Sequence, residues 1–218
     1  MNPMHNSPGK QSGLSMIEVL VSLLILMVGL LGLAGLQTQG LRSEMESYQR
    51  VQALNLLQDM AGRISANRGN NSLPTNCTAL TTLTVPTRFS CEWDNIRANV
   101  NAYVANDIGV TDVQPVDCTT LAVGKLRDTC DWSYALKGAA ETSVTGRVGA
   151  MIGGRGCVTL VSSDATQISV QVHVAWQGMG KSFSQATNLC GKDLYGGDDD
   201  TQRRVVSLTM RIANLSAI

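Results

Sequence analysis

Aromatic side chains and basic clusters are scarce in this sequence. Only 4% of its 218 residues are Phe, Trp or Tyr, and Lys plus Arg equal Asp plus Glu at 17 each, so the formal net charge is zero. Proteins that hold nucleic acid by charge gather Lys and Arg on one face, often together with aromatic residues. The sequence has no such basic run, and we therefore expect no nucleic-acid partner.

Metal ligands at short spacing are also lacking. The sequence has two histidines, His5 and His173, and no Cys-x-x-Cys motif among its six cysteines. Structural zinc sites usually take four closely spaced Cys and His ligands. We therefore predict neither a metal site nor a cofactor.

Three other places could carry chemistry and are interpreted structurally. His173 alternates with apolar residues and is predicted to be a solvated surface residue. Asp198-Asp199-Asp200 is interpreted as a solvated turn rather than a calcium site, because adjacent aspartates cannot all point at one ion. Gly153-Gly154-Arg155-Gly156 precedes a predicted strand, not the helix N-terminus that binds phosphate, and is interpreted as a flexible lead-in. No catalytic group is predicted.

What the sequence does contain is one long apolar segment near its start. From Leu14 to Leu36 it runs for 23 residues with Glu18 as its sole ionisable side chain, and about 20 apolar residues suffice to span a bilayer as a helix. An ordinary secretory signal has a shorter apolar core and is cleaved after it, whereas Gly13 precedes this segment. We predict a membrane-spanning helix over 14–36.

The carboxylate of Glu18 needs a compensating partner. A charge in an apolar span costs about 2.5–3.5 kcal/mol at mid-bilayer and less near an end. Cleavage after Gly13 would give Leu14 a cationic α-amine one helical turn from Glu18. Within one chain the two groups fit poorly, but in neighbouring subunits they could neutralise each other.

The segment Gly13–Glu18 resembles the type III signal of type IV prepilins. The continuation from Ser15 to Ala34, with Gln49-Arg50 and Ala66-Asn67, is similar to minor pilins of the PilV type. Leu14 departs from the family pattern, in which phenylalanine usually follows the glycine. The resemblance covers roughly residues 9–68.

The resemblance implies a route of processing and assembly. A prepilin peptidase would remove the leader, residues 1–13, by cutting between Gly13 and Leu14, and would N-methylate Leu14. Glu18 would then dock to the amino terminus of a neighbouring pilin. The protein would wait in the inner membrane of a Gram-negative bacterium as a single-pass protein with a cytoplasmic N-terminus. It would later join major and minor pilins in a surface pilus, where it would prime assembly or form the tip complex for motility or adhesion.

Two alternatives stay open. A pseudopilin of type II secretion would share the signal and the helix, although six cysteines and a large loop-rich domain favour the pilus. A membrane-anchored periplasmic enzyme or redox protein would keep its leader, and the sequence offers no catalytic constellation for it.

All six cysteines follow the apolar segment, and an even number in an exported domain is typical of a disulfide framework. Six cysteines can pair in many ways. The sequential pairing closes the shortest loops and is the one we favour, and each bridge of this size would contribute roughly 3 kcal/mol. It joins Cys77–Cys91, Cys118–Cys130 and Cys157–Cys190.

Periodicity extends the apolar helix beyond Leu36. No proline occurs between Leu14 and Leu73, and Gly69 supplies a stop signal. We therefore predict one helix over 14–68, apolar all round over 14–36 and amphipathic over 37–68. Its apolar face would pack on a globular domain, residues 69–218. The apolar residues of that face recur every three or four positions. They are Leu41, Met45, Tyr48, Val51, Leu54, Leu57, Met60 and Ile64.

In the last third of the chain apolar and polar residues alternate, as they do in the strands of a sheet. Ile168–Trp176 and Val205–Ile212 have period-two patterns typical of half-buried strands, and Cys157–Ser162 makes a shorter one. Two short helices, over 94–106 and 131–140, are predicted before them. We expect an α+β fold, with a long N-terminal helix covering one face of a C-terminal antiparallel sheet and disulfides holding the loops.

Overall fold

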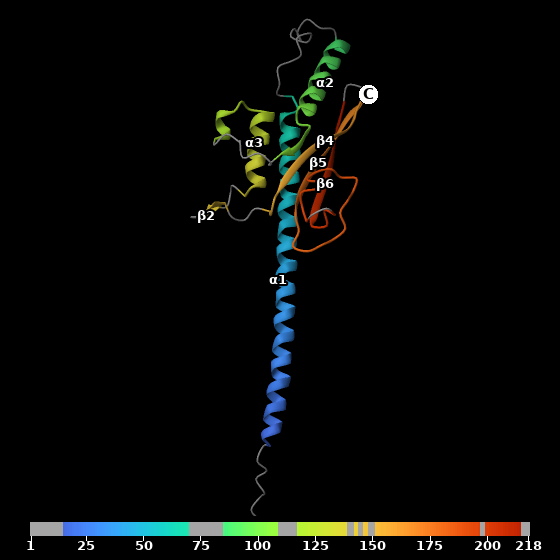
Figure 1. The fold of residues 1–218 in the computed structure, drawn as a ribbon. Helices are drawn as coiled ribbons and strands as arrows, with labels where there is room; N and C mark the ends of the chain where they lie inside the picture. Colours follow the sequence, from blue (N-terminus) through green and yellow to red (C-terminus); the bar gives the residue numbers. More distant parts are fainter. Residues whose placement is uncertain are drawn as a thin grey trace, which may run out of the picture. The chain divides into compact units, whose positions relative to one another are not determined.

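The computed structural model describes residues 15–69, 85–108, 117–138, 142–143, 146–147, 151–196 and 199–214 (Figure 1). It divides into two compact units, Met1–Met45 and Glu46–Ile218. The predicted leader and its cleavage position lie outside the described residues, as does Cys77, and of Cys91 only the backbone is described.

A single helix, α1 (Met16–Asn67), supplies residues to both units. The predicted continuous helix over 14–68 is confirmed over Met16–Asn67, while Leu14 lies outside the described residues, and the helix ends at the turn of Arg68 and Gly69. The many leucines and the absence of proline favour helix in this stretch.

The second unit is built around a four-stranded antiparallel sheet of order β1-β4-β5-β6. Three of its strands were predicted from alternation and are confirmed as β4 (Arg155–Ser163), β5 (Gln167–Gln177) and β6 (Arg203–Ala213). The fourth, β1 (Ala105–Ile108), was not predicted. A strand of four residues is too short to show a period, and its first two residues were assigned to the end of the 94–106 helix.

The two short helices exist, but their bounds differ from those predicted. They are α2 (Val85–Ala102) and α3 (Lys125–Leu136), each beginning earlier than the sequence suggested. A 3-10 turn, η2 (Cys118–Thr120), precedes α3, and Asp117 caps it by accepting a hydrogen bond from the Thr119 amide at 2.8 Å. A small hairpin of β2 (Thr142–Ser143) and β3 (Gly146–Arg147) follows α3.

The second half of α1 forms one wall of the core. Its buried residues include Ala53, Leu57, Met60 and Ile64, each at most 1% exposed. They belong to the same cluster as the inner face of the sheet, which supports the predicted helix cover. Inward-facing sheet residues that are fully buried are Val158, Val170, Val172 and Val174.

The buried face of α1 agrees with the prediction at Leu57, Met60 and Ile64 and departs from it nearer the N-terminus. Tyr48, Val51 and Leu54 are 53%, 54% and 43% exposed, whereas Gln49 and Ala53 are buried. Hydrophobicity alone assigned the larger side chains to the core. The helix instead presents a small residue, Ala53, where it packs into the core.

Both faces of β5 are covered. The prediction of a strand was correct, but the prediction that it is only half buried was wrong. Ser169, His173 and Ala175 lie on the face opposite α1 and are 3%, 6% and 0% exposed. The connection between β5 and β6, drawn in orange beside the strands in Figure 1, contributes Cys190 and Tyr195 to a second small core on this side. We call this side of the sheet the outer face and residues 178–202 the β5–β6 loop.

The glycines before β4 are a close-packing point and not the flexible lead-in that was predicted. A Cβ on Gly156 would stand 2.1 Å from Cζ3 of Trp132, and one on Gly154 would stand 2.7 Å from the carbonyl oxygen of Leu136. Side chains cannot occupy such positions unless α3 moves. Trp132 is fully buried and donates a hydrogen bond from Nε1 to the Leu56 carbonyl of α1 at 2.9 Å, so the glycines allow α3 to dock.

Two disulfides are present among the described residues, Cys118–Cys130 and Cys157–Cys190. Both pairs belong to the sequential connectivity favoured from loop length. The first ties η2 to α3. The second ties β4 to the β5–β6 loop and spans β5.

Candidate functional site

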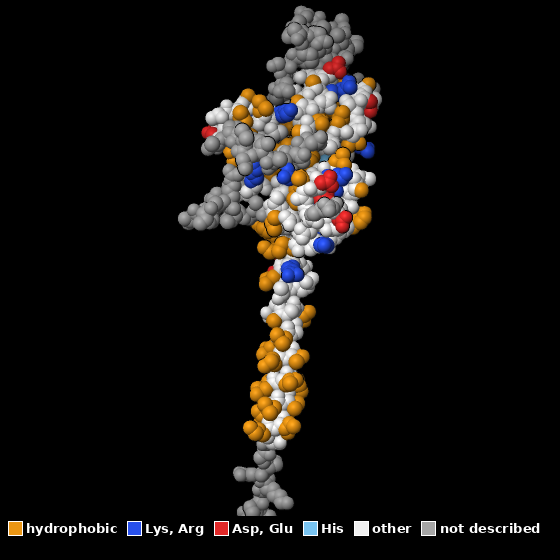
Figure 2. Space-filling model, in the orientation of Figure 1, with side chains coloured by type: hydrophobic (Ala, Val, Ile, Leu, Met, Phe, Trp, Pro, Cys, Tyr) orange, Lys and Arg blue, Asp and Glu red, His pale blue; other side chains and the backbone are white. Residues whose placement is uncertain are grey.

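The first unit exposes its apolar side chains instead of burying them. The large hydrophobic residues between Met16 and Leu36 are between 45% and 85% exposed, and Figure 2 shows them in orange along α1. By length and composition α1 qualifies as a membrane-spanning helix near the N-terminus, since an 18-residue stretch of it has a mean hydropathy of 2.7. Such a surface is stable only in lipid or against other apolar helices.

Glu18 lies in the first turn of α1 and is exposed. Its backbone amide donates to the Ser15 carbonyl at 2.9 Å, and its own carbonyl accepts a hydrogen bond from the Ser22 hydroxyl. A carboxylate at a helix N-terminus is favoured by the helix dipole, although only by a few tenths to about 1 kcal/mol. The side chain is therefore available to a cation supplied from outside this helix. Because Leu14 is not among the described residues, its pairing with Glu18 stays a prediction.

Three glycines interrupt the apolar surface of this segment. A Cβ at Gly29, Gly32 or Gly35 would meet nothing within 4 Å in this chain. Packing among the described residues of the monomer therefore gives no reason for glycine at these positions. The two remaining reasons are close approach of another helix and weakening of the helix by a poor helix former.

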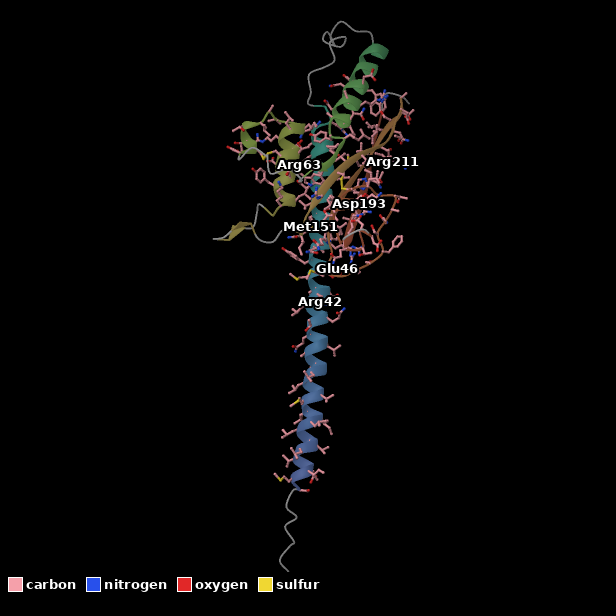
Figure 3. The ribbon with its side chains drawn as sticks, viewed as in Figure 1. Arg42, Glu46, Arg63, Met151, Asp193 and Arg211 are labelled. Atoms are coloured by element: carbon pink, nitrogen blue, oxygen red, sulfur yellow. A yellow bond between two sulfur atoms is a disulfide. The ribbon has the colours of Figure 1, made fainter. Side chains whose placement is uncertain are left out.

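In the second unit a charged cluster joins α1, α3 and the turn after α2. Arg63 of α1 is labelled in Figure 3. Its guanidinium lies 2.9 Å from Asp59, 3.4 Å from Asp128 and 3.3 Å from Asp131, the last two on α3. Asp128 also accepts from Asn67 at 2.6 Å and from the Tyr103 hydroxyl. Burial and this hydrogen bond raise the pKa of Tyr103 well above its usual value. The cluster fastens α3 to α1 and has the character of a structural contact.

The aspartate run before β6 was interpreted as a solvated turn, and for Asp200 this is wrong. Asp200 is 5% exposed and forms an ion pair with Arg203, which is 3% exposed. The backbone of Asp200 has a positive φ of 53°, which aspartate tolerates better than most residues. Arg203 also donates to the carbonyls of Gln185 at 2.6 Å, Asn188 at 2.6 Å and Cys190 at 3.1 Å. A buried cation thus holds the β5–β6 loop.

His173 is likewise buried and not the solvated surface residue that alternation predicted. Its Nε2 lies 2.9 Å from Thr159 Oγ1, and its Nδ1 lies 2.7 Å from Ser207 Oγ and 2.9 Å from Asn188 Nδ2. Asn188 accepts from the Cys190 amide through Oδ1, which directs its NH₂ group at the imidazole. Because an amide NH₂ only donates, Nδ1 must accept, and His173 is neutral with its proton on Nε2.

This arrangement predicts a pH dependence of stability. Burial lowers the pKa of His173 below its ordinary value of 6.5, so the unfolded chain binds a proton at higher pH than the folded one. The stability is therefore present above about pH 6.5 and is lost as the pH falls through the folded pKa. We expect the full chain in micelles to melt at lower temperature near pH 5 than near pH 7.5.

A His173→Gln variant serves as the control for this prediction. It removes the titrating group, so its melting temperature should change less between the same two pH values, whatever its absolute stability. Equal pH dependence in both proteins would contradict the assignment to His173.

The described residues thus form a pilin-like α+β fold, with a long N-terminal helix, an antiparallel sheet and disulfide-held loops. Two family models match the sequence. Residues 35–121 match the family described as type IV pilin Tt1218, and residues 8–34 match the prokaryotic N-terminal methylation motif. Neither a curated protein nor a solved structure is similar enough to this chain to count as a match.

The methylation-motif match includes Gly13, Leu14 and Glu18, the residues that the sequence singled out. The pilin match begins in the apolar helix and ends beyond η2. Sequence reasoning missed the buried polar groups His173, Asp200 and Arg203. The spacing of Asp200 and Arg203, three residues apart, was the one local signal that could have suggested a pair.

Proposed function

We propose that this chain is a minor pilin of a type IV pilus, of the PilV type, and has no enzymatic activity of its own. The observation that carries the proposal is the methylation motif placed directly before a pilin match. An exposed apolar helix that continues into a folded α+β unit supports it, because such a helix can pass from the membrane into a filament.

In this proposal the chain has four parts. Residues 1–13 are the leader, 14–36 the membrane and assembly helix, 37–68 the amphipathic helix and 69–218 the extracytoplasmic domain. A prepilin peptidase cuts after Gly13 and methylates Leu14. The protein is first held in the inner membrane of a Gram-negative cell with its N-terminus in the cytoplasm. It then joins major and minor pilins at the start or the tip of a surface pilus.

The processing step is tested directly on the membrane-extracted protein. We expect N-terminal sequencing and intact-mass spectrometry to show a chain that starts at Leu14 and carries one added methyl group. In a Gly13→Leu variant the leader should be retained, because in the family that the motif resembles the peptidase cuts after this glycine. An intact leader on the unmodified chain, in cells with an active prepilin peptidase, would overturn the proposal.

A second measurement separates the pilus from type II secretion. Mass spectrometry of sheared surface pili should detect the processed chain, and deletion of the gene should reduce piliation while leaving secreted enzymes unchanged. The opposite pattern would assign the chain to secretion.

A further inference from the structure

The outer face of the sheet and the β5–β6 loop line a cavity of about 660 Å³ that is open to solvent on one side. Small-molecule sites typically have volumes of roughly 300–1,000 Å³. The cavity lies wholly within the second unit and shares no residue with the N-terminal assembly segment.

The floor of the cavity is formed by adjacent cross-strand rows on the outer face. Thr159 is opposite Gln171 on β4 and β5, and His173 is opposite Ser207 on β5 and β6. Residues directly opposite in an antiparallel pair have Cβ atoms about 4.5–5.5 Å apart. The hydroxyl, amide and imidazole groups of the floor are therefore close enough to contact one small ligand together.

The wall of the cavity comes from Gln185, Thr187 and Asn188 of the β5–β6 loop. Three independent contacts hold this wall in place. They are the Cys157–Cys190 disulfide, the bonds from buried Arg203 to loop carbonyls, and the bond from the Ser182 amide to the Thr201 carbonyl at 2.7 Å. A site held in this way loses little conformational entropy when a ligand binds.

The described lining is polar but carries no full charge. Apart from the disulfide and Leu189 at 71% exposure, it consists of hydroxyls, amides and the neutral His173, with no Asp, Glu, Lys or Arg among the described lining residues. The guanidinium of Arg203 is occupied by loop carbonyls and Asp200. Phosphates, carboxylates and metal ions would find no counter-charge here. An apolar ligand would displace water from the exposed side chains of Gln185 and Thr187 without replacing its hydrogen bonds.

Hydroxyl and amide groups both donate and accept hydrogen bonds. The ligand that matches such a lining is a neutral molecule whose groups also do both at short intervals, and a sugar ring is such a molecule.

From this geometry we propose that the cavity between the outer face and the β5–β6 loop binds a neutral saccharide of one or two rings. Gln171 and Ser207 contact the sugar hydroxyls from the floor, and Gln185 and Thr187 contact them from the wall. His173 is a positioning residue, since both its nitrogens are already engaged by Thr159, Ser207 and Asn188.

The test uses the full chain in micelles of lauryldimethylamine oxide, a detergent without a sugar head group. Saturation-transfer difference NMR is recorded with glucose, galactose, N-acetylglucosamine and lactose as probes. Glucose 6-phosphate and N-acetylneuraminic acid serve as anionic comparisons. We expect saturable binding of at least one neutral sugar, with weaker binding of its anionic counterpart.

The variants locate the site. Gln185→Leu and Thr187→Val should each weaken binding roughly three- to tenfold, as expected for the loss of one hydrogen bond. Thr201→Val makes the same change in the same loop outside the lining and should bind like the unchanged protein. Near-ultraviolet circular dichroism and intact disulfides confirm folding in each case.

Three results would overturn the proposal. They are no binding of any neutral probe by folded protein, equal binding by the two lining variants and the unchanged chain, and a preference for the anionic sugars. None of these results bears on leader cleavage or on the presence of the chain in pili, so the pilin proposal stands or falls separately.

Discussion

A Glu18→Ala variant is expected to reach the membrane normally but to be nearly absent from sheared pili. Removing a charge from an apolar helix makes membrane insertion easier, so any loss must arise in assembly. The exposed carboxylate in the first turn of α1 would lose its attraction to a neighbour's amino terminus. We expect the pilus fraction to fall by at least about tenfold, equivalent to roughly 1.4 kcal/mol of assembly free energy.

Quantitative immunoblots of membranes and sheared pili measure this effect. Glu44→Ala is the matched control, because it removes a carboxylate from the same helix outside the apolar segment. Wild-type amounts of the Glu18 variant in pili would show that the carboxylate has no part in docking. Equal losses in both variants would point to a general effect of charge on the helix.

Arg203→Met is expected to cause the largest loss of stability in the second unit. It leaves Asp200 charged and buried without its partner, and it frees the carbonyls of Gln185, Asn188 and Cys190. Removing one member of a buried ion pair typically costs about 3–5 kcal/mol. Urea denaturation of the oxidised full chain in micelles, followed by tryptophan fluorescence, measures the change.

Arg211→Met provides the control on the same strand. Arg211 is exposed on β6 (Figure 3), and surface substitutions of this kind usually change stability by less than about 0.5 kcal/mol. Adding Asp200→Asn to the Arg203 variant should recover part of the loss, since the uncompensated charge is then gone. A midpoint for Arg203→Met equal to that of Arg211→Met would refute the anchoring role of Arg203.

The local sequence pattern was sufficient to predict those helices and strands in which the pattern repeats over many residues. The apolar run and the lack of proline predicted α1, and alternation predicted β4, β5 and β6, because both signals accumulate along the chain. The four residues of β1 are too few for such a signal. The bounds of α2 and α3 depend on tertiary contacts, such as the docking of Trp132 beside Gly156, that no local window contains.

The polar groups of the outer face were misread for a physical reason. Alternation reports which side of a strand is hydrophobic, but a polar side can also be buried when a distant loop supplies its hydrogen-bond partners. Asn188 and Ser207 do this for His173 across sequence separations of 15 and 34 residues. Similarly, the sequence Gly153-Gly154-Arg155-Gly156 looks flexible when it is considered alone. The ring of Trp132, which packs against Gly156, shows that a small residue is required there.

The contribution of α1 to the core also decides how a water-soluble fragment should be cut. A fragment that starts at residue 69 would lack Ala53, Leu57, Met60 and Ile64, all fully or almost fully buried, and would expose the sheet that they cover. One that starts at Gln49 would keep these residues but would lose Glu46 (labelled in Figure 3). The carboxylate of Glu46 pairs with Arg204 of β6 at 2.6 Å. The useful cut therefore lies before Glu46, within the helix itself. A soluble fragment would begin with a helical end whose apolar N-terminal continuation has been removed.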